Sequence, residues 1–465
     1  MQKLKLNWQE PLDFAQVVSE NYGDSDWVFL YSGLSLEVKN SRSYIGLFVQ
    51  EKIVAEDFAA AEKILKNSGK KWFGYLAYEL GGEFEKLPQG EKSFVDLPKV
   101  CLVNFAVVLE FEHAVKKLSV SFENQEKWEQ VARWTPQQVR GDNALALRHK
   151  FKVGSLNLSP RLHDGVHRDT PEISSFNSNF TNQSYLTAIT DIKKMIAAGD
   201  FYQTNLTRKF FGTFTKKPTA QENFQLFTNL TKLSPANYSA FLKLDNNYVI
   251  SSSPELFLKI KNGKIFSRPI KGTAPRNSDP KQDRKNKSNL KNSPKERAEN
   301  LMIVDLVRND LSRICEAGSV IVKKLFQITS YKNIHHMSSE IHGEITENFS
   351  AIDAVKACFP PGSMTGAPKI KAIETAAQKE KLNRGIYSGA IGYFCGEEIN
   401  LSVVIRTLVL RGEKFEFQTG GAITFDSDAQ AELAETFSKA KGIVELLGLN
   451  VEWIDPETSS GWQWG

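Results

Sequence analysis

Hydrophobic and polar residues follow regular periods most clearly in the second half of the chain. Leu186, Ile189, Ile192 and Ile196 recur at helical spacing and end at Gly199, so this segment is predicted to be a helix. Four short apolar runs follow, separated by polar turns that contain Asn or Gly, which is typical of an antiparallel meander. Its strands are expected at 238–244, 248–252, 256–260 and 265–270.

Further along, strong polarity alternates with new helix and strand patterns. The segment 277–295 is almost wholly polar, and we predict a solvated, mobile loop there. A helix is expected from Pro294, because proline is favoured in the first helical turn. Strands are expected at 389–393, 399–410 and 415–419, and a last helix at 429–447. Meanders that alternate with helices favour an α+β fold of antiparallel sheets covered by helices.

The first 180 residues have a weaker pattern. Their clearest feature is a hairpin that joins 100–109 to 118–121. Residues 135–182 are rich in Pro, Ser, Asn and Asp, which indicates a linker or a long surface loop. We expect residues 1–180 to contribute strands to one composite body with a catalytic region at 181–449, and residues 450–465 to form a C-terminal tail.

Composition narrows the class of protein. The 465 residues are 41% hydrophobic and 24% charged, which is ordinary for a soluble globular protein. A net charge of +5 is too small to indicate a nucleic-acid partner, and the apolar run at 100–109 is too short to span a membrane. The cysteines form no CxxC pair and no signal peptide precedes them, so we expect reduced thiols in a cytoplasmic enzyme or enzyme subunit. These cysteines are Cys101, Cys315, Cys358 and Cys395.

Lys271 is the first candidate for chemistry. It lies between Pro269 and Gly272 where an apolar run enters a polar one, so its backbone is restrained and a ligand can approach closely. In a dry pocket its amine becomes harder to protonate and therefore nucleophilic. Glu255 lies sixteen residues earlier and could deliver a proton to a leaving hydroxyl. A solvated loop lysine and a solvated turn glutamate are the alternatives.

Two pairs of glutamates form a second group of candidates. Glu296 and Glu299 lie three residues apart on one expected helix, and Glu432 and Glu435 repeat the spacing on the last helix. This spacing puts both members of a pair on one helical face. Oxygen ligands without histidine or thiolate suit Mg²⁺ better than Zn²⁺. For either pair alone, a charged outer face is the simpler interpretation.

Several residues are suited to binding an anion. Arg406 lies within an apolar run and must be paired, and its planar fork suits a carboxylate. Gly420 and Gly421 follow an expected strand and offer backbone N–H groups. His335 and His336 are adjacent and point differently, so a core or substrate-contact role is expected rather than a metal site. The segment 361–369 does not fit GxxxxGK[ST], which argues against ATP.

Six segments taken together resemble the chorismate-utilising enzymes. These segments are 199–206, 253–255, 269–273, 299–310, 361–368 and 435–436. The resemblance is strong from about 182 to 449 and loose before that. It implies two mainly antiparallel sheets packed as a sandwich with helices on the outside, and chorismate as the substrate.

Two positions sort the branches of this family. Isochorismate and salicylate synthases carry a lysine base where this chain has Gln203, and an amide cannot take a proton from water, so these branches are disfavoured. Anthranilate synthases usually carry a small residue where this chain has Lys271. The resemblance therefore favours the aminodeoxychorismate synthase component I branch, which leads to 4-aminobenzoate and folate. Anthranilate synthase component I is the alternative, followed by a catalytically silent paralogue and, last, nucleic-acid binding by 277–295.

The resemblance also implies a role for each candidate. Lys271 would attack C2 of chorismate, Glu255 would protonate the departing C4 hydroxyl, Gln203 would lie at the reaction site, and ammonia would then attack C4. Mg²⁺ would be held by Glu299 and Glu435, with Glu296 and Glu432 behind them. Residues expected to contact the substrate are Arg406, Tyr387, Gly420, Gly421, Thr365, His336, Lys439 and Thr273.

Two partners follow from the resemblance. No amidotransferase segment with a cysteine nucleophile is visible, so ammonia is expected from a separate glutaminase subunit in a heterodimer. Relatives bind tryptophan in a second pocket, which corresponds here to 29–33 and 234–239. Because Tyr31 stands where feedback-regulated relatives have a glutamate, the resemblance argues against regulation by free tryptophan and leaves open whether tryptophan binds there.

Overall fold

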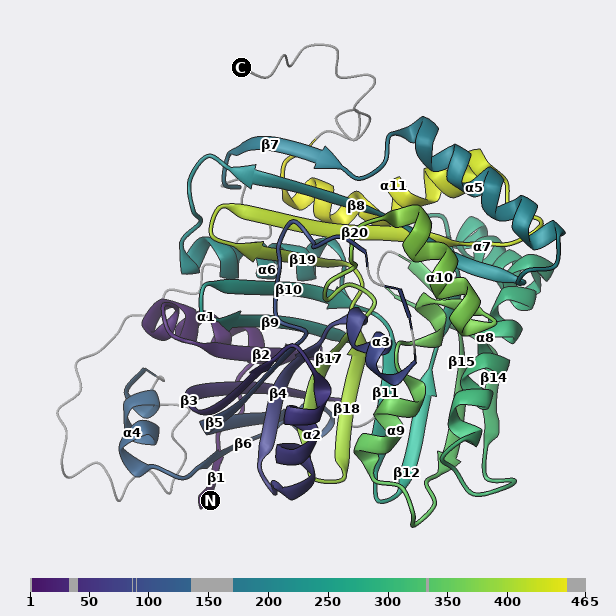
Figure 1. Ribbon diagram of the computed structural model, residues 1–465. Coiled ribbons are helices and arrows are strands. Elements are labelled where there is room, and N and C mark those ends of the chain that lie inside the picture. Colours follow the sequence, from purple (N-terminus) through teal and green to yellow (C-terminus); the bar gives the residue numbers. More distant parts are fainter. Residues whose placement is uncertain are drawn as a thin grey trace.

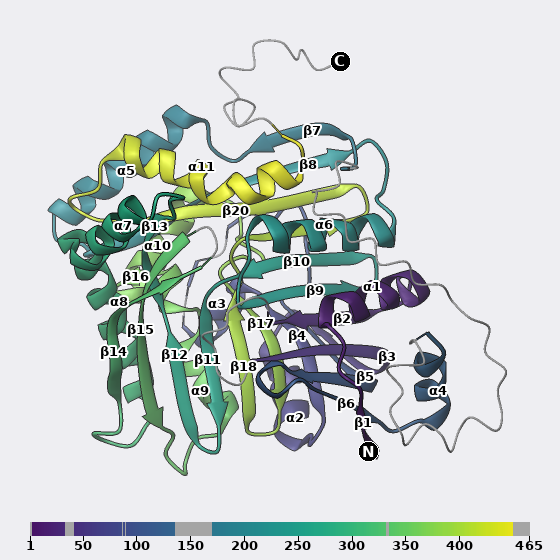
Figure 2. The ribbon, with the colours of Figure 1, turned by 180° about the vertical axis from the view of Figure 1, so that it is seen from behind.

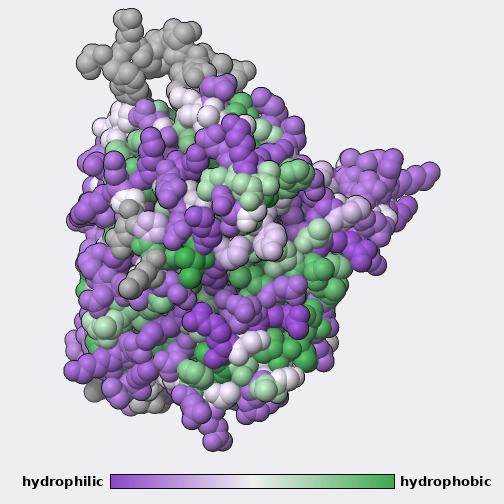
Figure 3. Space-filling view, turned by 45° about the vertical axis from the view of Figure 1, so that its right-hand side comes forward, coloured by the Kyte–Doolittle hydropathy of each residue, from purple (hydrophilic) through white to green (hydrophobic). Residues whose placement is uncertain are grey.

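The computed structural model describes residues 2–32, 41–85, 87–88, 90–134, 170–331 and 334–449. Most of the expected linker at 135–182, the tail at 450–465 and Gly33 of the expected second pocket lie outside the described residues. Figures 1 and 2 show strands in two orientations with helices around them. Hydrophilic side chains dominate the face in Figure 3, with hydrophobic ones in scattered groups.

The first sheet is antiparallel throughout and runs horizontally in Figure 1. Its strands, in spatial order, are β7 (Ile173–Ser178), β8 (Gln203–Phe214), β20 (Lys414–Ile423), β19 (Thr407–Arg411), β10 (Asn247–Ser253), β9 (Tyr238–Leu244), β2 (Trp27–Tyr31), β3 (Arg42–Ala55), β5 (Val100–Glu112), β6 (Lys117–Phe122) and β1 (Gln2–Leu6). A short strand, β16 (Gly366–Ala367), pairs with the start of β8.

The second sheet shares strand β5 with the first sheet. Residues 107–112 of β5 pair with β6, while residues 100–104 pair with the first strand of the second sheet. From there the order is β4 (Lys71–Leu76), β17 (Ala390–Cys395), β18 (Glu398–Val403), β11 (Leu256–Lys261), β12 (Lys264–Arg268), β15 (Ile334–Glu344) and β14 (Ile321–Ser330), with β13 (Ile270–Pro275) also on β15.

The two sheets enclose a common apolar core. Val28 and Leu242 come from the first sheet, Phe73 and Ile391 from the second, and all four belong to one cluster of buried side chains. Burial of these facing side chains is what holds two sheets together. The expected sandwich of mainly antiparallel sheets is therefore confirmed. Strands from the first 180 residues take part in both sheets, while the proposed boundary at residue 180 stays a prediction.

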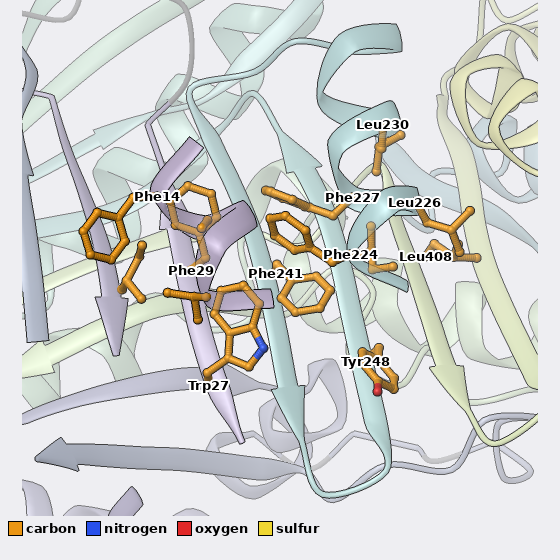
Figure 4. Packing of buried hydrophobic residues seen from close by; sticks show 14 of the residues in the cluster. Phe14, Trp27, Phe29, Phe224, Leu226, Phe227, Leu230, Phe241, Tyr248 and Leu408 are labelled. Carbon is orange, nitrogen blue, oxygen red and sulfur yellow. The ribbon is translucent and has the colours of Figure 1, made fainter. Parts of the chain in front are cut away.

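Helices cover the outer faces. The first sheet is covered by α1 (Pro11–Tyr22), α4 (Gln125–Trp134), α6 (Ala220–Leu233) and α11 (Ala429–Leu446). In Figure 4, Phe224 and Phe227 of α6 lie against Trp27 and Phe29 of β2, and the ring centroids of Trp27 and Phe224 are 5.4 Å apart. Thr219 precedes α6 with a complete capping box, which satisfies the N–H groups of Thr219 and Glu222.

The second sheet is covered by α2 (Phe58–Asn67), α8 (Pro294–Ser312) and α9 (Ala351–Cys358). The other helices of the described residues are α3 (Gly81–Phe84), α5 (Asn182–Ala197), α7 (Pro280–Asn292) and α10 (Lys369–Glu380), with short 3₁₀ turns at Tyr78–Leu80, His113–Val115 and Gly362–Met364. Helices α5, α8 and α11 and the hairpin of β5 and β6 confirm the sequence-based predictions. Within the described ranges, none of the helices has the length and apolar character needed to cross a membrane.

The prediction of a mobile loop at 277–295 is wrong. Most of this segment is helix α7, which begins after Asp279, whose carboxylate accepts hydrogen bonds from the N–H groups of Lys281 and Gln282. Leu290 is its one buried residue. Lysine, arginine and glutamine are good helix formers, so strong polarity did not preclude a helix here.

The expected meander and the long strand at 399–410 are also corrected. β10 pairs with β9 and β19 in the first sheet, whereas β11 pairs with β12 and β18 in the second. The chain thus crosses between the sheets at 254–255 and again at 404–406. The two crossings touch, since Val403 donates to the carbonyl of Glu255 (3.1 Å) and Ser252 to that of Arg406 (3.1 Å). Arg406 has φ +50° and lies in the second crossing, not inside a strand.

Candidate active site

The two crossings bring Glu255 and Arg406 together at the junction of the sheets. Strand β13 adds Lys271 from the side. Its pairing with β15 is irregular between Ile270 and Thr273, so Lys271 and Gly272 form a bulge. Gly272 has φ +92°, and a Cβ there would lie 2.8 Å from a Glu296 carboxylate oxygen. Only glycine fits this position without strain or displacement.

Glu255 is a buried carboxyl whose pKa is raised. It is 4% exposed. Burial raises the pKa of Glu255 to about 7, opposed by a hydrogen bond from Ser363 and by the positive charge of Lys271. Desolvation is the dominant cause, as in other acids kept in apolar surroundings. At neutral pH a large fraction of the Glu255 side chains can therefore donate a proton.

The pKa of Lys271 is shifted downward, opposite to that of Glu255. Burial lowers the pKa of Lys271, and the positive charge of Lys439 lowers it further, while Glu299 and Glu255 oppose the change. A larger share of the amine is thus neutral than for a lysine in water. A protonated acid beside a neutral amine is the combination needed for nucleophilic attack with departure of a hydroxyl.

The four glutamates lie on two neighbouring helices, α8 and α11, which Lys295 joins. Lys295 Nζ lies 4.0 Å from Glu299 Oε1 on α8 and 3.6 Å from Glu432 Oε1 on α11. Burial raises the pKa of Glu296, Glu299 and Glu432. Burial acts in the same sense on Glu435, but its pKa is lowered because Lys439 Nζ lies 2.7 Å away. The carboxylates thus form a charged face that lysines partly neutralise.

The glutamates of α8 and α11 are the residues predicted to bind Mg²⁺. Within the described ranges, no three His, Cys, Asp or Glu side chains converge closely enough to hold a metal ion. The donors are nonetheless all carboxylate oxygens, which suit a hard divalent cation. Glu432 Oε2 is buried without a hydrogen-bond partner, and a Cβ on Gly421 would lie 2.8 Å from it. The chemistry of the donor set fits Mg²⁺, and the site stays a prediction.

Arg406 forms the anion-binding side of the junction. Its guanidinium lies 3.5 Å from Ser234 Oγ and 3.4 Å from His336 Nε2, and it has no ion pair with a carboxylate of the described residues. His336 Nδ1 contacts Thr273 Oγ1 at 3.2 Å. Burial and the charge of Arg406 hold the pKa of His336 well below its usual range, so the ring is neutral. The arginine fork is therefore available to a ligand carboxylate.

The adjacent histidines diverge, as predicted. His335 Nδ1 lies 2.8 Å from Ser330 Oγ, and its Nε2 lies 3.1 Å from Asp283 Oδ1 on α7. The Asp283 carboxylate also accepts hydrogen bonds from Arg276 and from the N–H of Asn277. The pKa of Asp283 is lowered to about 2, and the hydrogen bond from Arg276 is the largest cause. His335 therefore anchors α7, while His336 faces Arg406.

The remaining predicted site residues lie on β8, on β20 and in buried loops. Gln203 is fully buried at the start of β8, and neither amide atom has a hydrogen-bond partner. Thr365 and Tyr387 are also buried. Gly420 and Gly421 were expected to follow a strand, but this prediction is wrong. They lie within β20, where they pair with Thr207 and Leu206. The carbonyl of Gly420 accepts a hydrogen bond from Lys439 (2.7 Å).

Three polar residues at the site were missed by the sequence reasoning. Ser363 donates to Glu255 from a segment in which only Thr365 was expected to contact the substrate. Lys295 lies at the end of the segment predicted to be a solvated loop, although it bridges α8 and α11. Ser234 contacts Arg406 from a segment assigned only to the second pocket. Each was visible in the sequence, but its role depends on long-range placement.

Comparison with known proteins decides the family. The model of a family described as chorismate binding enzyme matches residues 31–445. The chain belongs to this family. Aminodeoxychorismate synthase component 1 of Escherichia coli (strain K12) is 35% identical over 380 residues, covering 80% of this chain and 76% of the relative. Anthranilate synthase component 1 of Aquifex aeolicus is 35% identical over 283 residues, covering 61% and 56%.

Two solved structures share the fold. Anthranilate synthase component I from Streptococcus pneumoniae TIGR4 superposes with a TM-score of 0.70 at 24% identity, covering 88% of this chain and 94% of that one. The menaquinone-specific isochorismate synthase MenF from Escherichia coli gives 0.72 at 17% identity, covering 96% and 94%. At such low identity the likeness shows the sandwich architecture alone.

A second cavity, of about 370 Å³, lies between the sheets. Its walls include Leu30 and Tyr31 from one expected segment and Asn237 and Ser239 from the other. Tyr44 and Tyr393 also line it, with ring centroids 5.1 Å apart. The two segments predicted to form a second pocket thus do line one cavity, which has room for a small ligand.

Proposed function

We propose that this chain converts chorismate and ammonia to 4-amino-4-deoxychorismate, a transferase reaction on the way to 4-aminobenzoate and folate. The pairing of Glu255 with Lys271 carries the proposal, because their pKa values are shifted in opposite directions at one junction. Similarity to the aminodeoxychorismate synthase of Escherichia coli supports the same branch. A lysine nucleophile is the feature that the anthranilate branch usually lacks.

The reaction begins with the neutral amine of Lys271. Its nitrogen forms a bond to C2 of chorismate, the ring double bonds shift, and the C4–O bond breaks. The carboxyl of Glu255 gives its proton to the departing hydroxyl, which leaves as water. The adduct is a secondary ammonium, and Glu255 is left as a carboxylate.

Ammonia completes the exchange. It forms a bond to C4, the double bonds shift back, and the C2–N bond breaks so that Lys271 leaves as a neutral amine. The new C4 ammonium returns a proton to Glu255, which restores both residues. The net change replaces one hydroxyl by an amine and releases one water, while the enolpyruvyl group is kept.

The remaining residues hold the dianionic substrate. Arg406 and Tyr387, with the backbone of Gly420 and Gly421, would bind the enolpyruvyl carboxylate, and His336, Thr365, Thr273 and Lys439 would lie near the ring or its carboxylate. Mg²⁺ held by Glu299 and Glu435, with Glu296 and Glu432 behind, would offset the charge of the ring carboxylate. The buried amide of Gln203 cannot deprotonate water, which favours amination over hydration.

Two partners belong to the proposal. Ammonia would come from a glutaminase subunit that forms a heterodimer with this chain. The second cavity would hold tryptophan as a structural ligand, because its tyrosine rings and polar rim suit an aromatic amino acid. A rise in the melting temperature with added tryptophan, absent with added leucine, would support this assignment.

Product analysis tests the function. The purified protein is incubated with chorismate, Mg²⁺ and a high ammonium concentration at mildly alkaline pH, and products are followed by mass spectrometry and a pyruvate assay. We expect an aminated product that keeps its enolpyruvyl group, is lost in Lys271→Ala and is kept in Lys285→Ala, an exposed control. Anthranilate with equimolar pyruvate would instead assign the chain to the anthranilate branch.

A further inference from the structure

A second buried charge cluster lies behind the candidate site. Arg384 and Glu380 are each 3% exposed and form a bidentate pair, with Nε 2.9 Å from Oε2 and Nη2 2.8 Å from Oε1. Glu380 ends α10, and Arg384 lies in the turn that follows. A bidentate arginine–carboxylate pair fixes the orientation of both groups. Neither residue belongs to the proposed catalytic set.

Arg384 uses its whole guanidinium to join separate segments. Besides its two bonds to Glu380, it donates to the carbonyls of Met364 (2.8 Å) and Asn205 (2.7 Å) and lies 3.4 Å from Ser388 Oγ. A guanidinium has five N–H donors, so all five have a partner. Lysine has three donors on one atom and cannot reproduce this pattern.

Each segment bound by this pair carries a candidate site residue. Met364 precedes Thr365, Ser388 follows Tyr387, and Asn205 lies two residues after Gln203 on β8. Glu380 Oε1 also accepts the N–H of Thr207 (2.8 Å), the partner of Gly420 in the sheet. The N–H of Asn205 donates to the carbonyl of Thr365 (2.7 Å), which closes the connection between the segments.

We propose that Arg384 and Glu380 are positioning residues for the chorismate site, because they hold the backbones beside Gln203, Thr365 and Tyr387 in one arrangement. The inference rests on the proposed placement of chorismate against these three residues. Loss of one N–H contact lets the segments shift relative to one another, and a small misplacement of binding groups weakens binding and slows reaction.

A second buried ion pair serves as a control that distinguishes a positioning role in the site from a general contribution to stability. Lys209 and Glu416 are also buried, at 1% and 4% exposure, and lie 3.0 Å apart on β8 and β20. Glu416, like Glu380, accepts a backbone N–H at 2.8 Å, in this case from Val95. Its partners Ser93 and Val95 lie in a segment without candidate site residues. Glu380→Gln and Glu416→Gln therefore remove the same kind of contact in two places.

The experiment compares Glu380→Gln, Arg384→Lys and Glu416→Gln with the full-length parent chain. Thermal unfolding gives the stability of each, calorimetry gives the chorismate Kd without turnover, and the ammonium-dependent assay gives kcat and KM. We expect similar losses in melting temperature for the two glutamine variants. Chorismate Kd and KM should rise tenfold or more in Glu380→Gln and Arg384→Lys, and stay within twofold in Glu416→Gln.

Two results would overturn the inference. One is a chorismate Kd within twofold of the parent value in both Glu380→Gln and Arg384→Lys. The other is an equal loss of affinity in Glu416→Gln, which would mean that any buried ion pair has this effect. If the parent chain produced anthranilate, the proposed function would be wrong. The comparison of chorismate Kd values would still test the positioning role, because Kd is measured without amination.

Discussion

The buried carboxyl of Glu255 should reduce the stability of the folded protein at neutral and alkaline pH. Its pKa rises from 4.5 to about 7 on folding, so the unfolded chain loses this proton first as the pH increases. Between these two values each pH unit costs about 1.4 kcal/mol, and the whole interval costs about 3 kcal/mol. The penalty is absent below the lower pKa and complete above the upper one.

Glu255→Gln removes this penalty, because glutamine is neutral at every pH and has nearly the same shape. The free energy of unfolding of the variant should exceed that of the parent by about 1 kcal/mol at pH 5.5 and by about 3 kcal/mol at pH 8. Urea unfolding at both pH values measures the difference. The same variant should lose the aminated product, since the proton donor is gone.

Glu222→Gln is a control of opposite sign. The N–H of Thr219 in the capping box lowers the pKa of Glu222, so its contribution is present at high pH and lost as the pH falls. This variant should be less stable than the parent at pH 8. If the difference between Glu255→Gln and the parent does not change with pH, Glu255 is not a desolvated acid, and the proposed proton donor fails with it.

Three further expectations follow from the site. At a fixed concentration of free ammonia, kcat/KM for chorismate should fall as pH rises above about 7, because Glu255 loses its proton; a flat alkaline profile would contradict this. Gly421→Ala puts a Cβ 2.8 Å from Glu432 Oε2 and should raise the half-saturating Mg²⁺ concentration at least tenfold, whereas Gly69→Ala, which meets no atom within 4 Å, should leave it unchanged. Asp283→Asn weakens the anchor of α7, so amide hydrogens of this helix should exchange faster by mass spectrometry while those of α6 do not, and equal rates in parent and variant would refute the anchoring role.

Local patterns were sufficient for most elements and for the members of the site. Helical spacing located α5, and alternating runs located β9 to β12. The glutamate pairs on α8 and α11 were found from a three-residue step. These features depend on neighbours within a few residues, which is the range over which periodicity reports.

The connections between sheets could not be predicted in the same way. Only Pro254 and Glu255 separate β10 from β11, a spacing that normally indicates a hairpin, yet the strands belong to different sheets. The decisive partners, β19 and β18, lie about 150 residues later in the chain. For the same reason Arg406 was assigned to a strand, since nothing local marks the bend that turns it toward His336.

The pairing of β8 with β20 has a consequence for how the protein is made. Thr207 pairs with Gly420, which follows it by 213 positions, so this contact forms only after residue 420 has been synthesised. Contacts between such distant residues are slow to form, because a long loop must close first. Because the junction needs both strands and α11, a growing chain that has not yet reached the end of α11 has no complete site. A ligand of this site should therefore bind only after these elements have folded, and it should then stabilise the newly folded molecules against unfolding.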